Sequence, residues 1–231
     1  MSALSHPAAP ARHEAKFVLP KIYTAQALAW LNHLCAPDPA YGENRVHSLY
    51  YDSLRMNALR QSEQGEYLKQ KVRLRWYTDE LEKEFSDKAY LEVKSKEGAR
   101  SWKTRVPMAL DVAALHREPA AAVRDLCLTD WLAPPAVPDL VAFAPVCVIS
   151  YLRSRFVDMA TGYRIALDSE ICLSNWSSER PRGNRPGTAR YSVLEVKGFA
   201  ARVLPPPLHV LNRYVIKKSA FSKYAECMRL E

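Results

Sequence analysis

The sequence lacks most of the signatures that reveal a function directly. It contains no P-loop, no G-x-G-x-x-G fingerprint and no H-E-x-x-H motif, which argues against the common nucleotide-binding motifs and zinc hydrolases. The five cysteines show no C-x-x-C spacing, so neither a zinc site nor a disulfide framework is predicted. No repeat of fixed period occurs, and the histidines do not gather at ligand spacing. The chemistry must therefore come from other residue types.

Long hydrophobic runs are missing as well. No apolar stretch approaches the length of a membrane span, and residues 1–11 lack the apolar core of a signal peptide. Most cysteines have apolar neighbours, as buried reduced thiols do. We therefore expect a cytoplasmic protein without a membrane segment, with a flexible tail over residues 1–11 and a single domain over residues 12–231.

Positive charge is what the chain has in excess. Its 231 residues carry a net charge of +8 and are 48% hydrophobic. That length and hydrophobicity suffice for a globular domain with a buried core. The charge favours an anionic partner, which could be nucleic acid, a phosphate compound or an acidic surface, and charge alone does not choose among these.

The cations alternate with apolar residues along the predicted strands. In K-V-R-L-R-W-Y at 71–77, a period of two places Lys71, Arg73 and Arg75 on one face and the apolar residues on the other. Like charges at 4 Å repel by about 1 kcal/mol in water, and one such strand is compatible with a solvated face. Charged faces of this kind recur on strands predicted at 12–19, 67–77, 90–96, 102–106, 146–158, 163–173 and 191–199. The recurrence argues against a merely solvated face.

An aromatic strand at 46–52 and several helices complete the predicted elements. Thr24 is the expected N-cap of a helix that ends before Pro37. Ser53 is expected to cap a short helix that runs through about residue 61. Residues 109–132 predict two short helices broken at Pro119, and a C-terminal helical segment is expected from 205–207 onward.

These elements predict an α+β fold, in which a closed antiparallel β-barrel forms a tunnel with helices packed on the outside. Lys, Arg and Glu side chains would line the tunnel. Such an interior must hold water and polyanions, because burying unpaired charge costs too much. Repeated phosphate groups suit the cations, and the few carboxylates would hold a divalent metal that bridges phosphates.

Eight short motifs, in one order, give the chain a resemblance to a known family. They are E-A-K-F at 14–17, S-L-Y-Y-D at 48–52, K-V-R-L-R-W-Y at 71–77, L-E-V-K at 91–94, Y-L-R-S-R at 151–155, Y-R-I-A-L-D at 163–168, L-E-V-K at 194–197 and F-S-K-Y at 221–224. Together they resemble the polyphosphate polymerase domain of the vacuolar transporter chaperone (VTC) family, within the CYTH-like triphosphate tunnel superfamily.

The resemblance implies a transferase that moves the γ-phosphate of ATP onto a growing inorganic polyphosphate chain, with Mn²⁺ or Mg²⁺ as cofactor. The implied catalytic residues are Arg73, Arg75, Lys94, Arg153, Arg164, Glu195 and Lys223. The implied phosphate-binding residues are Lys16, Lys71, Lys103, Tyr151, Lys197, Lys218 and Ser222. Glu195 and Glu14 are the implied metal ligands. Partners would be ATP and inorganic polyphosphate or pyrophosphate.

Two alternatives stay open. The first is a hydrolase of triphosphate or short polyphosphate, since hydrolases of this superfamily typically open with E-x-E-x-K. Here Arg12 stands at the first Glu position and leaves only Glu14 and Lys16, which favours the polymerase. The second is a non-catalytic protein that binds polyphosphate or RNA. The sequence shows no aromatic platform motif of the RNA-binding kind, so nucleic acid is not expected as a partner.

Overall fold

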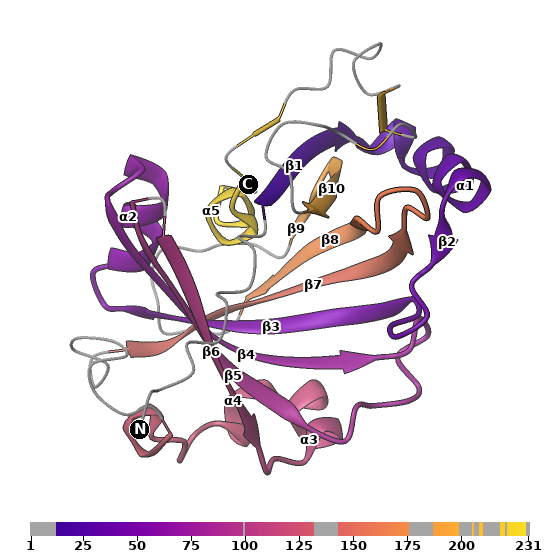
Figure 1. Ribbon diagram of the computed structural model, residues 1–231. Coiled ribbons are helices and arrows are strands. Elements are labelled where there is room, and N and C mark those ends of the chain that lie inside the picture. The colour runs from indigo at the N-terminus through magenta and orange to yellow at the C-terminus, as the bar shows by residue number, and fades with distance from the viewer. Residues whose placement is uncertain are drawn as a thin grey trace, which may run out of the picture. The chain divides into compact units, whose positions relative to one another are not determined.

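The computed structural model shows an α+β chain built on antiparallel strands (Figure 1). It describes residues 13–98, 100–131, 143–175, 187–198, 205, 208–209, 218–219 and 221–229. The tail predicted over residues 1–11 lies outside them. No helix in the described part of the chain is both long and apolar enough to cross a membrane.

The helices and strands follow one another along the chain as follows. The strands are β1 (His13–Pro20), β2 (Ala36–Pro37), β3 (Asn44–Ser53), β4 (Leu68–Thr78), β5 (Ala89–Glu97), β6 (Arg100–Met108), β7 (Phe143–Val157), β8 (Arg164–Asn175), β9 (Gly187–Thr188) and β10 (Tyr191–Gly198). The α-helices are α1 (Thr24–Leu34), α2 (Asn57–Gln64), α3 (Val112–Arg117), α4 (Pro119–Ala122) and α5 (Lys223–Cys227), and two 3-10 turns are η1 (Lys21–Tyr23) and η2 (Leu128–Asp130).

The chain divides into two compact units. The first comprises Met1–Gly42, Ser154–Asp168 and Tyr191–Ala220. The second comprises Glu43–Arg153, Ser169–Arg190 and Phe221–Glu231. The long strands β7 and β8 contribute residues to both. The single domain expected over residues 12–231 stays a prediction.

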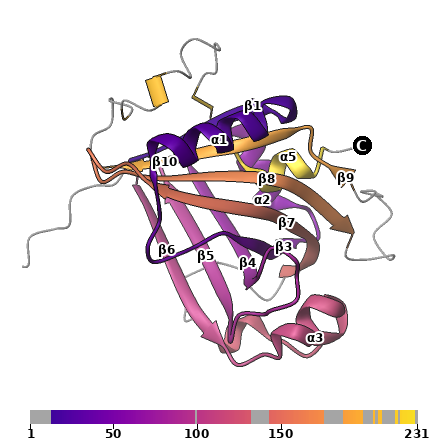
Figure 2. The same ribbon diagram turned by 90° about the vertical axis from the view of Figure 1, so that its right-hand side faces the viewer.

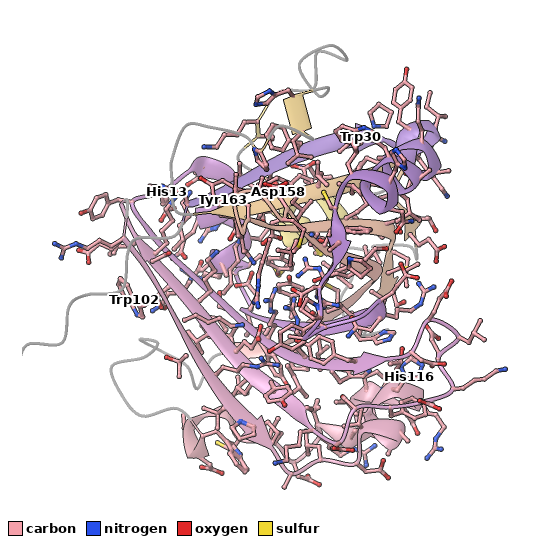
Figure 3. All side chains as sticks on the ribbon, turned by 45° about the vertical axis from the view of Figure 1, so that its right-hand side comes forward. His13, Trp30, Trp102, His116, Asp158 and Tyr163 are labelled. Carbon is pink, nitrogen blue, oxygen red and sulfur yellow. The ribbon has the colours of Figure 1, made fainter. Side chains whose placement is uncertain are left out.

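The first unit pairs β1 with β10 and β10 with β8, all antiparallel. On one face Phe17, Leu167 and Leu194 pack in a hydrophobic cluster that also contains Leu31 of α1. Figure 2 shows the ribbon of α1 beside β1 and β10. Where β7 passes to β8, the N–H of Asp158 donates to the carbonyl of Tyr163, and these two residues lie together in Figure 3. The apolar cluster fixes one face of this sheet, and period two sends the charged residues to the other.

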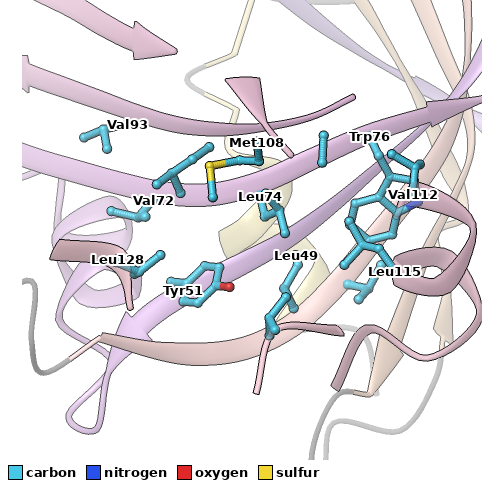
Figure 4. Packing of buried hydrophobic residues seen from close by; sticks show 14 residues of the cluster. Leu49, Tyr51, Val72, Leu74, Trp76, Val93, Met108, Val112, Leu115 and Leu128 are labelled. Atoms are coloured by element: carbon cyan, nitrogen blue, oxygen red, sulfur yellow. The ribbon is translucent and has the colours of Figure 1, made fainter. Parts of the chain in front are cut away.

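The second unit pairs β7 with β3, β3 with β4, β4 with β5 and β5 with β6, again antiparallel. Its core face carries Leu49, Leu74 and Trp76, against which Val112 and Leu115 pack (Figure 4). The latter two residues belong to α3, so this helix covers the apolar face. Lys71, Arg73 and Arg75 alternate with the core residues and take the opposite face.

Most predicted elements are confirmed, because strong period-two patterns indicate the strands and Pro119 marks a helix boundary. Pro119 begins α4, as expected for a proline at the first turn. The predicted N-cap at Thr24 is wrong, since Tyr23 holds that position and the Thr24 hydroxyl contacts the Ser192 hydroxyl at 2.6 Å. The predicted cap at Ser53 is also wrong, since Met56 is the N-cap of α2, although the Ser53 hydroxyl accepts the N–H of Asn57 at 3.1 Å. Most of the helical segment predicted from 205 onward lies outside the described residues.

Candidate functional site

Three adjacent strands of the second unit present a row of cations, which we call the β4–β5–β6 charged face. The antiparallel register places Lys71 opposite Lys94 and Lys94 opposite Lys103. One pair further along, Arg73 lies opposite Glu92 and Glu92 opposite Arg105. Directly opposed residues share a face of the sheet. The face comprises Lys71, Arg73, Arg75, Glu92, Lys94, Lys103 and Arg105.

Glu92 is the carboxylate at the centre of this face. It is only 2% exposed. Its Oε2 accepts from Nη2 of Arg73 at 2.7 Å and lies 3.6 Å from Nη1 of Arg75. Its Oε1 contacts Nζ of Lys103 at 2.5 Å and lies 3.4 Å from Nε of Arg105. One buried carboxylate therefore holds four cations from two neighbouring strands.

The charges around Glu92 change the protonation behaviour of the cluster. Burial raises the pKa of Glu92, but Arg75, Arg73 and Lys103 outweigh it and lower this pKa to about 2. Burial lowers the pKa of Lys103. Glu92 raises this pKa by a smaller amount, so the pKa of Lys103 is lowered overall. For Arg73, burial acts downward, while Tyr50 and Glu92 raise the pKa overall. Glu92 therefore stays ionised, and four positive charges share one negative charge.

Tyr151 collects three of the predicted catalytic cations. Its ring is 2% exposed, and its hydroxyl accepts from Nη2 of Arg75 at 3.2 Å. The guanidinium carbon of Arg153 lies 5.2 Å from the ring centroid, and Nζ of Lys223 lies 4.8 Å from it. Cations at this distance from an aromatic face are attracted to it. The ring thus brings together charges from β4, β7 and α5.

The start of α5 is joined to β4. Nζ of Lys71 donates to Oγ of Ser222 at 2.7 Å. Ser222 is also the N-cap of α5, since its Oγ accepts from the N–H of Ala225 at 3.4 Å. Two residues predicted to bind phosphate are therefore in contact, and Lys223 follows directly in the chain.

The first unit carries a second charged face, the β1–β10–β8 charged face. Lys16 lies opposite Glu195, Glu14 opposite Lys197, and Lys197 opposite Arg164. Nζ of Lys16 contacts Glu14 at 2.9 Å, and Lys197 contacts Glu195 at 2.5 Å. Burial lowers the pKa of Lys16, but Glu195, Glu14 and Asp168 together raise it. The face comprises Glu14, Lys16, Arg164, Asp168, Glu195 and Lys197.

The acidic residues of this second face decide whether a divalent metal fits. Within the described residues, no three or more His, Cys, Asp or Glu side chains group closely enough to hold an ion. Glu195 is 6% exposed and Glu14 lies diagonally from it across the strand pair. Mg²⁺-type ions need only one or two carboxylates when substrate phosphates supply further oxygens. Glu195 and Glu14 therefore fit an ion that arrives with phosphate.

Three further residues predicted to bind phosphate have exposed side chains. The side chain of Arg164 is 54% exposed, and its Nε is 3.6 Å from Oδ2 of Asp38. Lys218 is exposed and forms an isolated bridge with Phe17 rather than with Lys16. Lys94 is exposed between two other lysines of the register. The phosphate-binding roles of these three residues stay predictions.

Sequence reasoning missed several polar partners of the cations. Glu92 and Arg105 were not among the expected site residues, although the antiparallel register of β5 and β6 places them opposite each other. Tyr50 was missed as well, and its hydroxyl accepts from Nη1 of Arg73 at 3.1 Å. Ser48 accepts from Nε of Arg75 at 3.1 Å. The register of the hairpin that turns at Gly98 sets Glu92 opposite Arg105, so writing out this register would have revealed the carboxylate.

Comparison with solved structures places the fold among known ones. A proposed adenylyl cyclase from Hippeastrum with a dominant triphosphatase activity superposes with a TM-score of 0.52 at 14% identity, over 96% of this chain and 100% of that chain. A proposed adenylate cyclase from Bacillus halodurans gives a TM-score of 0.52 at 12% identity, over 91% of this chain and 95% of that one. At such identities the likeness shows the fold alone. A comparison with curated proteins gives no match.

The family models give the remaining result. The model described as the VTC domain matches residues 11–231, which is nearly the whole chain. This confirms the resemblance that the eight motifs predicted. The chain therefore belongs to the VTC domain family.

Proposed function

We propose that this chain is a polyphosphate polymerase that transfers the γ-phosphate of ATP to a growing polyphosphate chain, with a divalent metal such as Mn²⁺ as cofactor. The observation that carries the proposal is the β4–β5–β6 charged face, in which the buried carboxylate of Glu92 contacts four cations. That face lies in a member of the VTC domain family. The proposal includes closure of the strands into a tunnel and a cytoplasmic location.

The residues described can supply positioning and charge neutralisation. Arg73 and Arg75 offer planar guanidinium groups for bidentate contacts to phosphate oxygens, and Lys71 and Lys103 offer point charges. Phosphoryl transfer needs little covalent chemistry from the protein, because in-line alignment and stabilisation of charge on the oxygens supply most of the catalysis. Glu195 and Glu14 would hold the metal, which would supply positive charge that neutralises phosphate oxygens. No covalent enzyme intermediate is required.

Hydrolysis of triphosphate is the competing candidate. It is favoured by the fold shared with the Hippeastrum protein, which has a dominant triphosphatase activity. The small number of carboxylates argues against it here, because Glu14 contacts Lys16 and Glu195 contacts Lys197. A site for two metals would need more oxygen ligands than these two residues offer.

The decisive experiment incubates the purified chain with ATP and Mn²⁺ and sizes the products by gel electrophoresis. Long phosphate chains with stoichiometric ADP are expected. Arg73→Ala and Glu195→Gln should each lower the rate strongly, while Arg117→Ala on the exposed surface of α3 should leave it unchanged. Release of orthophosphate alone would support the hydrolase, and tripolyphosphate binding without turnover would support a binding protein.

A further inference from the structure

The short helix α5 presents two of the residues predicted to bind phosphate. Ser222 caps it and Lys223 is its first residue. A helix of five residues is far below the length at which isolated helices are stable in water. Contacts with the rest of the second unit must therefore hold it, and those contacts decide where Lys223 and Ser222 lie.

Tyr224 makes the main buried contact of α5. It is 1% exposed, and its hydroxyl donates to Oδ2 of Asp52 at 2.9 Å. Its ring stacks on that of Tyr50, with centroids 4.9 Å apart and an angle of 4° between the planes. The Tyr50 hydroxyl in turn accepts from Nη1 of Arg73. Tyr224 therefore connects α5 both to a buried carboxylate and to the β4–β5–β6 charged face.

Asp52 is fully buried near the end of β3, a few residues before α2. Its Oδ1 accepts the N–H groups of Ser53 at 2.7 Å and Ala58 at 2.9 Å, and its Oδ2 accepts that of Leu59 at 3.0 Å. These bonds fix the carboxylate relative to the first turn of α2. The hydroxyl of Tyr224 therefore binds an acceptor that cannot easily move, and α5 is held against α2.

Ala225 and Cys227 of α5 are buried, whereas Arg229, which follows the helix, forms two exposed ion pairs. Nε of Arg229 lies 3.1 Å from Glu63 on α2, and its Nη1 lies 3.3 Å from Glu226. Exposed ion pairs of this kind contribute little to stability. Burial of Ala225 and Cys227 packs the helix without a preferred direction, whereas the hydrogen bond between Tyr224 and Asp52 has a defined geometry and sets the position of α5.

The row Ser48, Tyr50 and Asp52 on β3 gives this hydrogen bond a wider context. Alternate residues of a strand share a face, and each of the three accepts a hydrogen bond from a different group. Ser48 accepts from Arg75, Tyr50 from Arg73 and Asp52 from Tyr224. Ser48 and Tyr50 bind predicted catalytic arginines directly. By analogy, Asp52 holds α5 in place through Tyr224.

We infer that Asp52 and Tyr224 are positioning residues that place Lys223 and Ser222 for phosphate binding and do not touch the phosphate. The inference rests on the proposed function, because it assumes that the charged face binds phosphate chains. We call the hydrogen bond between Tyr224 and Asp52 the latch. With the latch formed, Lys223 lies over the Tyr151 ring and Ser222 contacts Lys71 before any ligand arrives. Without the latch, α5 must become ordered when the ligand binds, and the conformational entropy lost at that step lowers the affinity.

The test is the affinity for inorganic tripolyphosphate, measured by calorimetry on Tyr224→Phe. This change removes only the hydroxyl and keeps the stacked ring. We expect binding to weaken about tenfold, in keeping with the loss of one buried hydrogen bond to a charged acceptor. Tyr51→Phe is the matched control. Tyr51 is buried in the hydrophobic cluster, and its hydroxyl has no hydrogen-bond partner among the described residues, so that variant should bind like the wild type.

The same substitution in a variant that lacks the Ser222 and Lys223 side chains distinguishes a positioning role of Tyr224 from direct phosphate contact and from a general loss of structure. In a Ser222→Ala/Lys223→Ala variant, adding Tyr224→Phe should change the affinity by less than about twofold, because the groups that the latch positions are gone. An equal tenfold loss in that background would overturn the positioning role, as would unchanged binding by Tyr224→Phe alone. A wild-type protein that does not bind tripolyphosphate would overturn the proposed function and this inference together.

Discussion

Arg73 donates two hydrogen bonds to a single carboxylate oxygen of Glu92, from Nε at 2.9 Å and from Nη2 at 2.7 Å. The other oxygen of Glu92 takes Lys103 and Arg105. Both carboxylate oxygens of Glu92 are thus engaged with cations of the β4–β5–β6 charged face. Under the proposed function, Glu92 holds these cations close together before phosphate binds, which would reduce the reorganisation needed on binding.

Replacing Glu92 with Gln should destabilise the protein by about 3 kcal/mol, because removing one partner of a buried charge cluster leaves the others uncompensated. Urea unfolding at pH 7 measures the change. Added tripolyphosphate should recover more stability in this variant than in the wild type, since the anion replaces the missing charge. Glu97→Gln, on an exposed position of the same strand, is the control and should change little. Equal stability of the two variants would contradict this account of Glu92.

The stability that Glu92 contributes should disappear in acid. Its pKa is lowered from 4.5 to about 2 in the folded protein, so the contribution is present above about pH 4.5 and is lost as the pH falls toward 2. The difference amounts to about 3 kcal/mol. The free energies of unfolding of wild type and Glu92→Gln should therefore converge between pH 5 and pH 2.5. A constant difference over that range would show that Glu92 acts through packing rather than charge.

Much of the fold followed from the sequence because its periodicities are strong. Alternation over 71–77 gave β4 and its two faces, and Pro119 gave the boundary between α3 and α4. Thr24 misled because a threonine that precedes an apolar stripe fits either the cap or the first turn. Its contact with Ser192 comes from a segment far along the chain, which local patterns do not reveal.

The candidate site was predictable in its cations and not in the groups that hold them. Arg73, Arg75 and Lys71 were found because they repeat at every second residue. Glu92 depends on register across β4, β5 and β6. The contact between Tyr224 and Asp52 joins residues 172 positions apart. The second pairing follows from the tertiary fold, and a single sequence contains no direct signal for it, whereas the hairpin at Gly98 does carry a signal for Glu92.

His47 should make stability depend on pH in a second, less acidic range. It is 2% exposed, stacks on Trp76 and contacts Ser150 and Thr78 through its two ring nitrogens. Burial, with His116 and Arg45 nearby, lowers its pKa from 6.5 to about 3. The unfolded chain therefore binds a proton that the folded protein does not, and stability falls by about 1.4 kcal/mol per pH unit below pH 6.5.

The measurement for His47 is urea unfolding between pH 6.5 and pH 5, where few carboxylates titrate. His47→Gln should be less stable than the wild type at pH 7.5 but should show a flatter dependence on pH. His33→Gln changes an exposed histidine on α1 and should keep the wild-type slope. Identical slopes for wild type and His47→Gln would mean that His47 is not held neutral in the folded protein.

Tripolyphosphate should raise the melting temperature of the wild-type protein, because a ligand that binds only the folded state stabilises it by mass action. At a concentration 100 times the Kd the gain is about 2.7 kcal/mol, or about 5 to 10 °C for a chain of this size. Arg153→Ala should reduce this shift, since it removes a half-buried cation beside Tyr151. Arg117→Ala lowers the net charge equally, but Arg117 is exposed on α3, the helix that covers the apolar face. If both variants lost the shift to the same extent, the anion would be responding to net charge rather than to the charged face. If Arg153→Ala alone lost it, the binding energy would be located on the side of the sheet where Tyr151 gathers its cations.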